Sequence, residues 1–99
     1  MPVPYTIIHN KQNMRFEIHV DDQIAFLEYR LHDGNIAFMH TEVPALFAGK
    51  GAGSALAVYA FQYARENNLP VKVYCPFVAK FIKKYPEYQS QVIPNREHL

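Results

Sequence analysis

The sequence predicts a mixed α/β (α+β) fold, with an antiparallel four-stranded meander followed by a β-α-β crossover and a C-terminal helix. Three observations predict it. β-Branched, aromatic and alternating segments, separated by turn residues, fill the first 43 positions. A segment with apolar residues at helical spacing and then a short β-branched run follow them. The chain has 99 residues, 49% of them hydrophobic, which suits one compact domain over residues 1–99.

Four strands are expected before residue 44. Residues 5–10 and 14–20 are rich in β-branched and aromatic side chains, and in the second segment apolar and polar residues alternate. Two aspartates then form a plausible turn before residues 23–31. The Asp-Gly pair at 33–34 is a strong tight-turn signal before residues 35–43. Consecutive strands joined by such short turns form an antiparallel meander.

A helix is expected over residues 54–68, because apolar residues recur there at spacings of three and four among several alanines. The short β-branched segment 71–75 is expected to form a fifth strand. Since strand, helix and strand make a crossover unit, this strand should run parallel to residues 35–43 with a right-handed connection. Prolines favour a last helix over residues 76–85, and residues 91–93 are expected to add an edge strand.

Composition excludes several classes of function. Ten basic against nine acidic residues give a net charge of +1, which argues against a nucleic-acid binder. The single cysteine, Cys75, excludes an internal disulfide and a cysteine-rich zinc site, and no other metal site is expected. No apolar run approaches the roughly 18 to 20 residues of a membrane span, and no secretory signal is present. The expected location is therefore the cytoplasm.

A glycine-rich loop lies between the fourth strand and the first helix. Free backbone N–H groups and the positive end of the helix dipole attract anions at such a place, and glycines let a phosphate approach the backbone. A purely structural tight turn is the alternative. The nucleotide P-loop is excluded because glycine follows the lysine, and the dinucleotide fingerprint fails because serine stands at its third glycine. The expected anion-binding residues are Gly49, Lys50, Gly51, Ala52, Gly53 and Ser54.

Three motifs occur in an order and spacing that resemble a known family. They are "HTEVP" (40–44), "GKGAGSALA" (49–57) and "CPFV" (75–78) followed by "YPEY" (85–88). The chain is similar to the GNAT superfamily of acetyltransferases, and within it to the small single-domain YjdJ-type group. The resemblance covers nearly the whole chain and implies a GNAT-like fold that uses acetyl-CoA as cosubstrate.

The resemblance also implies where acetyl-CoA binds. The pyrophosphate is expected on the N–H groups of residues 49–54, and the pantetheine arm on the backbone of Thr41, Glu42 and Val43 between two splayed parallel strands. Ala48 departs from the superfamily pattern, which usually has a long polar side chain there. Two early helices that normally help to form the acceptor site are also missing, so the acceptor is not carried over from the family.

Three residues are candidates for the chemistry. His40 and Glu42 stand two apart on one strand, so both face the same side and either can act as base toward an amine acceptor. The alternatives are a structural histidine and a solvated carboxylate. Pro76 places Cys75 at a helix N-cap, where a thiol is activated. The resemblance puts Cys75 near the thioester, which permits an acetyl-Cys75 intermediate assisted by His40; a small buried apolar residue is the alternative.

The sequence therefore predicts an acetyltransferase that transfers acetyl from acetyl-CoA to an amine on a small molecule or a protein. The transfer is expected by direct attack or through acetyl-Cys75. Two other functions stay open. One is a CoA-binding or acyl-CoA-binding module with little or no transfer activity. The other is a protein interaction domain with a purely structural glycine loop.

Overall fold

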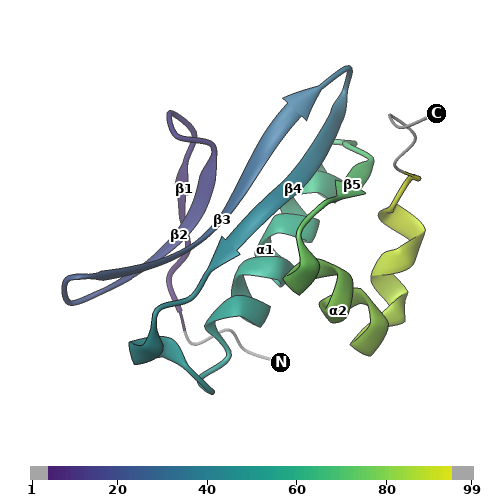
Figure 1. Cartoon of the computed structure of the whole chain (residues 1–99). Coiled ribbons are helices and arrows are strands. Elements are labelled where there is room, and N and C mark those ends of the chain that lie inside the picture. Colours follow the sequence, from purple (N-terminus) through teal and green to yellow (C-terminus); the bar gives the residue numbers. More distant parts are fainter. Residues whose placement is uncertain (1–4, 95–99) are drawn as a thin grey trace.

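A five-stranded sheet in the order β1-β2-β3-β4-β5 is the centre of the molecule, with two helices against one of its faces (Figure 1). The computed structural model describes residues 5–94. The strands are β1 (Ile8–Asn10), β2 (Arg15–Val20), β3 (Gln23–His32), β4 (Asn35–Glu42) and β5 (Val71–Val73). The helices are α1 (Ala52–Glu66) and α2 (Pro76–Lys84), with the 3-10 helices η1 (Ala45–Phe47) and η2 (Pro86–Gln91).

The predicted meander and crossover are confirmed. β1 to β4 pair antiparallel in sequence order, and β5 pairs parallel with β4. α1 connects β4 to β5 and begins at Ala52, two residues before its predicted start. α2 begins at Pro76 with Cys75 as its N-cap residue, as predicted. The mixed α/β fold class is therefore correct.

The predicted edge strand over residues 91–93 is wrong. Residues 86–91 form η2, and next to it Val92 makes a single parallel bridge to Val71. The reason lies in contacts with α1. Gln91 accepts a hydrogen bond from the Arg65 guanidinium and donates one to the Phe61 carbonyl, which fixes Gln91 against the helix. Contact with β5 is therefore limited to the Val92 bridge and the bond from the Ile93 N–H to the Val71 carbonyl.

The core lies between the sheet and the two helices. Its centre is aromatic: the Phe38 ring from β4 meets the Phe61 ring from α1 edge to face at 5.2 Å, and Phe81 from α2 lies on the other side of Phe61. Phe38 and Phe61 are fully buried. Burying a ring of this size stabilises the fold by about 2 to 3 kcal/mol. This contact fixes α1 against the strand that carries the predicted site.

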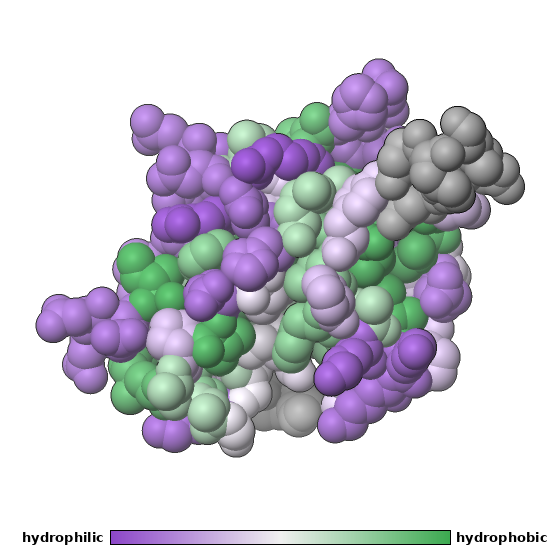
Figure 2. All heavy atoms as spheres, viewed as in Figure 1, coloured by the Kyte–Doolittle hydropathy of each residue, from purple (hydrophilic) through white to green (hydrophobic). Residues whose placement is uncertain are grey.

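The opposite face of the sheet carries mainly polar side chains. Figure 2 shows hydrophilic residues gathered over the β1–β2 hairpin and at the turn between β3 and β4. Within residues 5–94, no helix is long and apolar enough to cross a membrane. In the same range, no group of three His, Cys, Asp or Glu side chains is placed to hold a metal ion.

His9 is expected to make the stability of the fold depend on pH. Its ring lies 4.6 Å from that of Phe16 and 4.7 Å from that of Tyr63, and Nε2 is 2.7 Å from the Tyr29 hydroxyl. Burial, and secondly the charge of Lys11, lower the pKa of His9 below 6.5. Its neutral form therefore stabilises the fold at pH values above about 6.5, and this contribution is lost as the pH falls toward the lower pKa of the folded protein.

Urea unfolding between pH 7.5 and pH 5.5 measures this effect. The free energy of unfolding should fall more steeply with falling pH in the wild type than in His9→Gln. The two slopes should differ by at most about 1.4 kcal/mol per pH unit. Glu17 does not contribute to the pH dependence of stability between pH 5.5 and pH 7.5. Burial raises the pKa of Glu17, but hydrogen bonds from His19, Arg15 and Asn10 outweigh burial and leave the pKa below 4.5. Equal slopes for the two proteins would contradict the role of His9.

Candidate functional site

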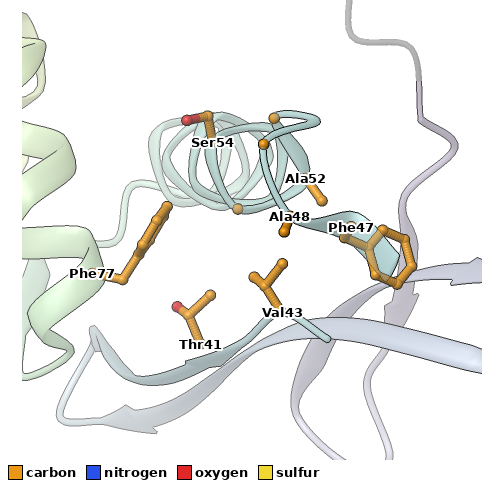
Figure 3. Close-up of a pocket in the computed structure, with 10 residues that line it drawn as sticks. Thr41, Val43, Phe47, Ala48, Ala52, Ser54 and Phe77 are labelled. Carbon is orange, nitrogen blue, oxygen red and sulfur yellow. The ribbon is translucent and has the colours of Figure 1, made fainter. Parts of the chain in front are cut away.

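A cavity of about 360 Å³ opens where β4 ends and α1 begins (Figure 3). Its volume is at the lower end of the range for small-molecule sites. It is lined by Thr41, Val43, Phe47, Ala48, Gly49, Gly51, Ala52, Gly53, Ser54 and Phe77. The predicted cofactor-binding residues therefore come together here, except Glu42 and Lys50, which do not line the cavity.

The glycine loop is held in a left-handed backbone conformation. Gly49 has a φ of 70° and Gly51 a φ of 78°, which residues with a Cβ adopt only at a cost of about 1 to 2 kcal/mol. A Cβ at either position would meet nothing within 4 Å, so conformation and not crowding requires glycine there. The Tyr5 hydroxyl donates a hydrogen bond of 2.9 Å to the Lys50 carbonyl and ties the loop to the N-terminal segment.

The first turn of α1 presents unpaired backbone donors to the cavity. The Ala55 N–H donates a hydrogen bond of 2.9 Å to the Gly51 carbonyl, and this is the i to i−4 bond that begins the helix. The N–H groups of Ala52, Gly53 and Ser54 precede that bond, and the N-cap Gly51 brings no capping side chain. Together with the positive end of the helix dipole, these N–H groups suit an anion such as a phosphate.

β4 and β5 diverge beside the cavity. Their ladder joins Ile36 to Val71 and Phe38 to Val73. After that, the N–H groups of Tyr74 and Cys75 both donate to the Phe38 carbonyl at 3.0 Å, so the chain turns away from β4. β4 continues to Glu42 with β3 as its neighbour. An extended ligand can lie along this part of β4 as a further strand would.

A β-bulge in β4 decides which side each candidate residue faces. Glu28 of β3 stands opposite His40 and Tyr29 opposite Phe38, so Met39 is an extra residue in β4. The alternation of side chains therefore reverses at this point. Phe38 before the bulge and Thr41 after it both face the helices. His40 and Glu42 face the opposite side, which we call the open face.

His40 and Glu42 are hydrogen-bond partners on the open face. His40 Nε2 lies 2.9 Å from Glu42 Oε1, and both side chains are more than half exposed. The edge of the His40 ring meets Phe26 at 6.0 Å. The prediction that His40 and Glu42 share one face is confirmed. A carboxylate that holds one ring nitrogen of a histidine leaves the other nitrogen able to accept a proton.

Cys75 lies on the other side of the sheet. It is buried, with 2% of its surface exposed, and Sγ is 3.2 Å from the Thr41 hydroxyl. This contact bridges the two diverging strands. Since Thr41 faces the helices and His40 faces the open side, the structure does not bring His40 and Cys75 together on one face. An acetyl-Cys75 route with direct help from His40 has no support in this arrangement.

Two residues that line the cavity were missed from the sequence. Phe47 belongs to the short helix η1, and Phe77 comes from the first turn of α2, far along the chain from the glycine loop. The motif "CPFV" contains Phe77, but the direction of the Phe77 side chain depends on how α2 packs against α1 and the sheet. Phe47 is 3% exposed and contacts Tyr5. No local sequence signal distinguishes these two rings from ordinary core residues.

Comparisons with known proteins agree on one family. Residues 15–92 match the family model described as GCN5-related N-acetyl-transferase. Protein NATD1 of Mus musculus is 25% identical over 96 residues, covering 92% of this chain and 87% of the relative. NATD1 of Bos taurus is 26% identical, with 92% and 85% covered. The solution structure of a GCN5-like protein from Staphylococcus aureus has 29% identity and a TM-score of 0.73, covering 95% of this chain and 93% of that one.

Proposed function

Because the chain belongs to the GCN5-related N-acetyltransferase family, we propose that it transfers acetyl from acetyl-CoA to an amine. One observation carries the proposal: the cavity joins the unpaired N–H groups of α1 to the stretch of β4 that diverges from β5. A diphosphate fits the first part and an extended amide-containing arm fits the second. These are the diphosphate and the pantetheine arm, two adjoining parts of the CoA molecule.

The residues that we propose to hold acetyl-CoA are those expected from the sequence, and the lining of the cavity supports most of them. Within residues 49–54, the N–H groups of Ala52, Gly53 and Ser54 would bind the pyrophosphate, because the Lys50 N–H already donates to the Phe47 carbonyl at 3.1 Å. The Lys50 side chain would be a nearby cation. The backbone of Thr41, Glu42 and Val43 would bind the pantetheine arm. The thioester would then lie near Thr41, at the gap between β4 and Cys75. Acetyl-CoA supplies an activated acyl group, so the protein itself needs to bind, orient and remove a proton.

His40 is the base in this proposal, with Glu42 holding its ring. An amine is mostly protonated at neutral pH, because its pKa is near 10.4, and it must lose a proton to react. The amine nitrogen attacks the thioester carbonyl carbon, the new C–N bond forms and the C–S bond breaks. Before the attack, the protonated amine gives one proton to His40 through a water molecule, because His40 faces the open side while the thioester lies at the gap beside Thr41. The second proton that the nitrogen loses passes to the departing thiolate, so CoA leaves as the thiol. The amine approaches from the open face, where His40 and Glu42 are exposed.

Ligand-dependent thermal unfolding tests the proposal. A ligand at about 100 times its dissociation constant stabilises a protein by about 2.7 kcal/mol, which is on the order of 10 °C for a domain of this size. We expect that shift with acetyl-CoA and CoA at 1 mM, and little change with ATP or NAD. Thiol release in the presence of spermidine or a lysine-containing peptide then measures transfer.

The outcomes separate the possible functions. Binding of CoA species without thiol release from any amine would instead favour an acyl-CoA-binding module. No shift with any CoA species and no thiol release would overturn the proposal in favour of an interaction domain. We also propose a cytoplasmic location, because a chain with one cysteine has no internal disulfide that would call for an oxidising compartment.

Direct attack makes a specific prediction for Cys75. Cys75→Ser replaces the thiol by a hydroxyl that can still contact Thr41, and Cys75→Ala removes the contact. Both variants should keep turnover within about threefold of the wild type, since neither replacement touches the open face or the base. The measurement is steady-state thiol release, with the dissociation constant for acetyl-CoA as a check on the site. A loss above a hundredfold in both variants, with acetyl-CoA still bound, would establish the acetyl-Cys75 route instead.

A further inference from the structure

The ring of Phe77 lies against the first turn of α1. Phe77 is the second residue of α2, and its Cζ would be 2.5 Å from a Cβ built on Gly53. Gly53, unlike Gly49 and Gly51, does not have a positive φ. A Cβ at position 53 would therefore force the ring to shift, and glycine leaves the ring its place. This contact with the ring is a second reason for glycine at position 53, beside the close approach of a phosphate expected from the sequence.

Phe77 points into the cavity, whereas other apolar residues of α2 point into the core. Val78, Phe81 and Ile82 are buried, but Phe77 remains 37% exposed. Figure 3 shows the Phe77 ring at one side of the cavity and Phe47 at the other, with Thr41 and Val43 below and Ser54 above. A chain that runs from the N-terminus of α1 to Thr41 passes along the face of this ring.

We propose that Phe77, held in place by Gly53, is a specificity-determining residue that forms the apolar wall against which the pantetheine arm lies. This inference rests on the proposed function. Phe77 recognises a slender chain of amide and methylene groups that ends in a thioester, and its ring has no polar group to pair with the adenosine phosphates. The ring therefore discriminates a ligand that has the arm from one that has only the nucleotide part.

Calorimetric titrations with three probes test the inference. CoA and acetyl-CoA carry the arm, and adenosine 3′,5′-bisphosphate lacks it. Phe77→Ala should weaken binding of CoA and acetyl-CoA by about tenfold or more, the effect of losing one aromatic contact, and binding of the bisphosphate by less than about twofold. Leu31→Ala is the matched control, because Leu31 is an exposed apolar residue outside the cavity. It should leave all three affinities unchanged.

A double-mutant cycle tests the contact itself. Gly53→Ala introduces the Cβ that displaces the ring, so it should weaken CoA binding in the wild type but have no further effect on top of Phe77→Ala. Phe77→Leu, which keeps an apolar side chain, replaces Phe77→Ala if that variant does not fold. Thermal midpoints without ligand establish that each variant is folded.

Each result decides between the two proposals. A wild type that binds no CoA species overturns the proposed function, and the inference with it. A wild type that binds CoA, together with a Phe77 variant that binds it equally well, overturns the inference alone. The inference alone is also overturned if Phe77→Ala weakens binding of all three probes to the same extent. Additive effects of Gly53→Ala and Phe77→Ala on CoA binding would overturn it as well.

Discussion

Replacing Ser54 by aspartate is expected to weaken CoA binding about a hundredfold while leaving the free protein as stable as the wild type, or more stable. Ser54 is the third residue of α1 and lines the cavity. A carboxylate in the first turn of a helix is favourable by about 0.3 to 1 kcal/mol. The same charge would stand beside the proposed diphosphate, where repulsion at about 4 Å costs up to about 4 kcal/mol. Stability and affinity should therefore change in opposite directions.

Isothermal titration gives the affinity, and thermal unfolding without ligand gives the stability. Ser54→Ala is the first control, because it removes the hydroxyl without adding charge. Gln62→Glu is the second, because it adds the same charge on an exposed position of α1 that does not line the cavity. Wild-type affinity in Ser54→Asp would mean that the N-terminus of α1 does not hold the diphosphate, and the location of the site would have to be abandoned.

Replacing His40 by glutamine is expected to lower kcat by a factor of about 10² to 10⁴, the usual contribution of a general base. Binding of acetyl-CoA should not change, since His40 faces the open side and does not line the cavity. Glu42→Gln should have a smaller effect, about tenfold, because it removes the group that holds the ring at 2.9 Å but leaves the base in place. The measurement is steady-state thiol release with an amine found active in the screen.

A second histidine on the open face provides the control. His19 Nε2 lies 2.8 Å from Glu17 Oε1, so His19 also pairs with a glutamate two residues away. It stands on β2, which is separated from β4 by β3. His19→Gln should keep wild-type turnover. If His40→Gln and His19→Gln behave alike, the His40–Glu42 pair is not the base, and proton removal must be assigned to another group or to solvent.

Much of the fold was predictable because its signals are local. The alternation in residues 14–20 and the Asp-Gly pair at 33–34 predict strands and a turn, and the structure has them. Glycines with positive φ at positions 49 and 51 mark the loop before α1. Pro76 fixes the start of α2 and makes Cys75 its N-cap residue. Each feature depends on the backbone preferences of a few neighbouring residues, so the sequence alone determines it.

Other features depend on residues that are far apart in the sequence. The extra residue at Met39 follows from how β3 and β4 are registered, and it decides that Thr41 faces the helices while His40 faces the open side. Residues 86–91 are helical because Gln91 meets α1 across 30 positions of sequence.

The sequence by itself determined the order of the elements, the glycine loop and the shared face of His40 and Glu42. The tertiary structure decided that His40 and Cys75 lie on opposite faces, and that the ring of Phe77 fills the space left by Gly53. The physical reason is the range of the interactions. Turn, cap and strand preferences act between neighbours along the chain, whereas strand register and ring packing are fixed only when distant segments compete for the same space.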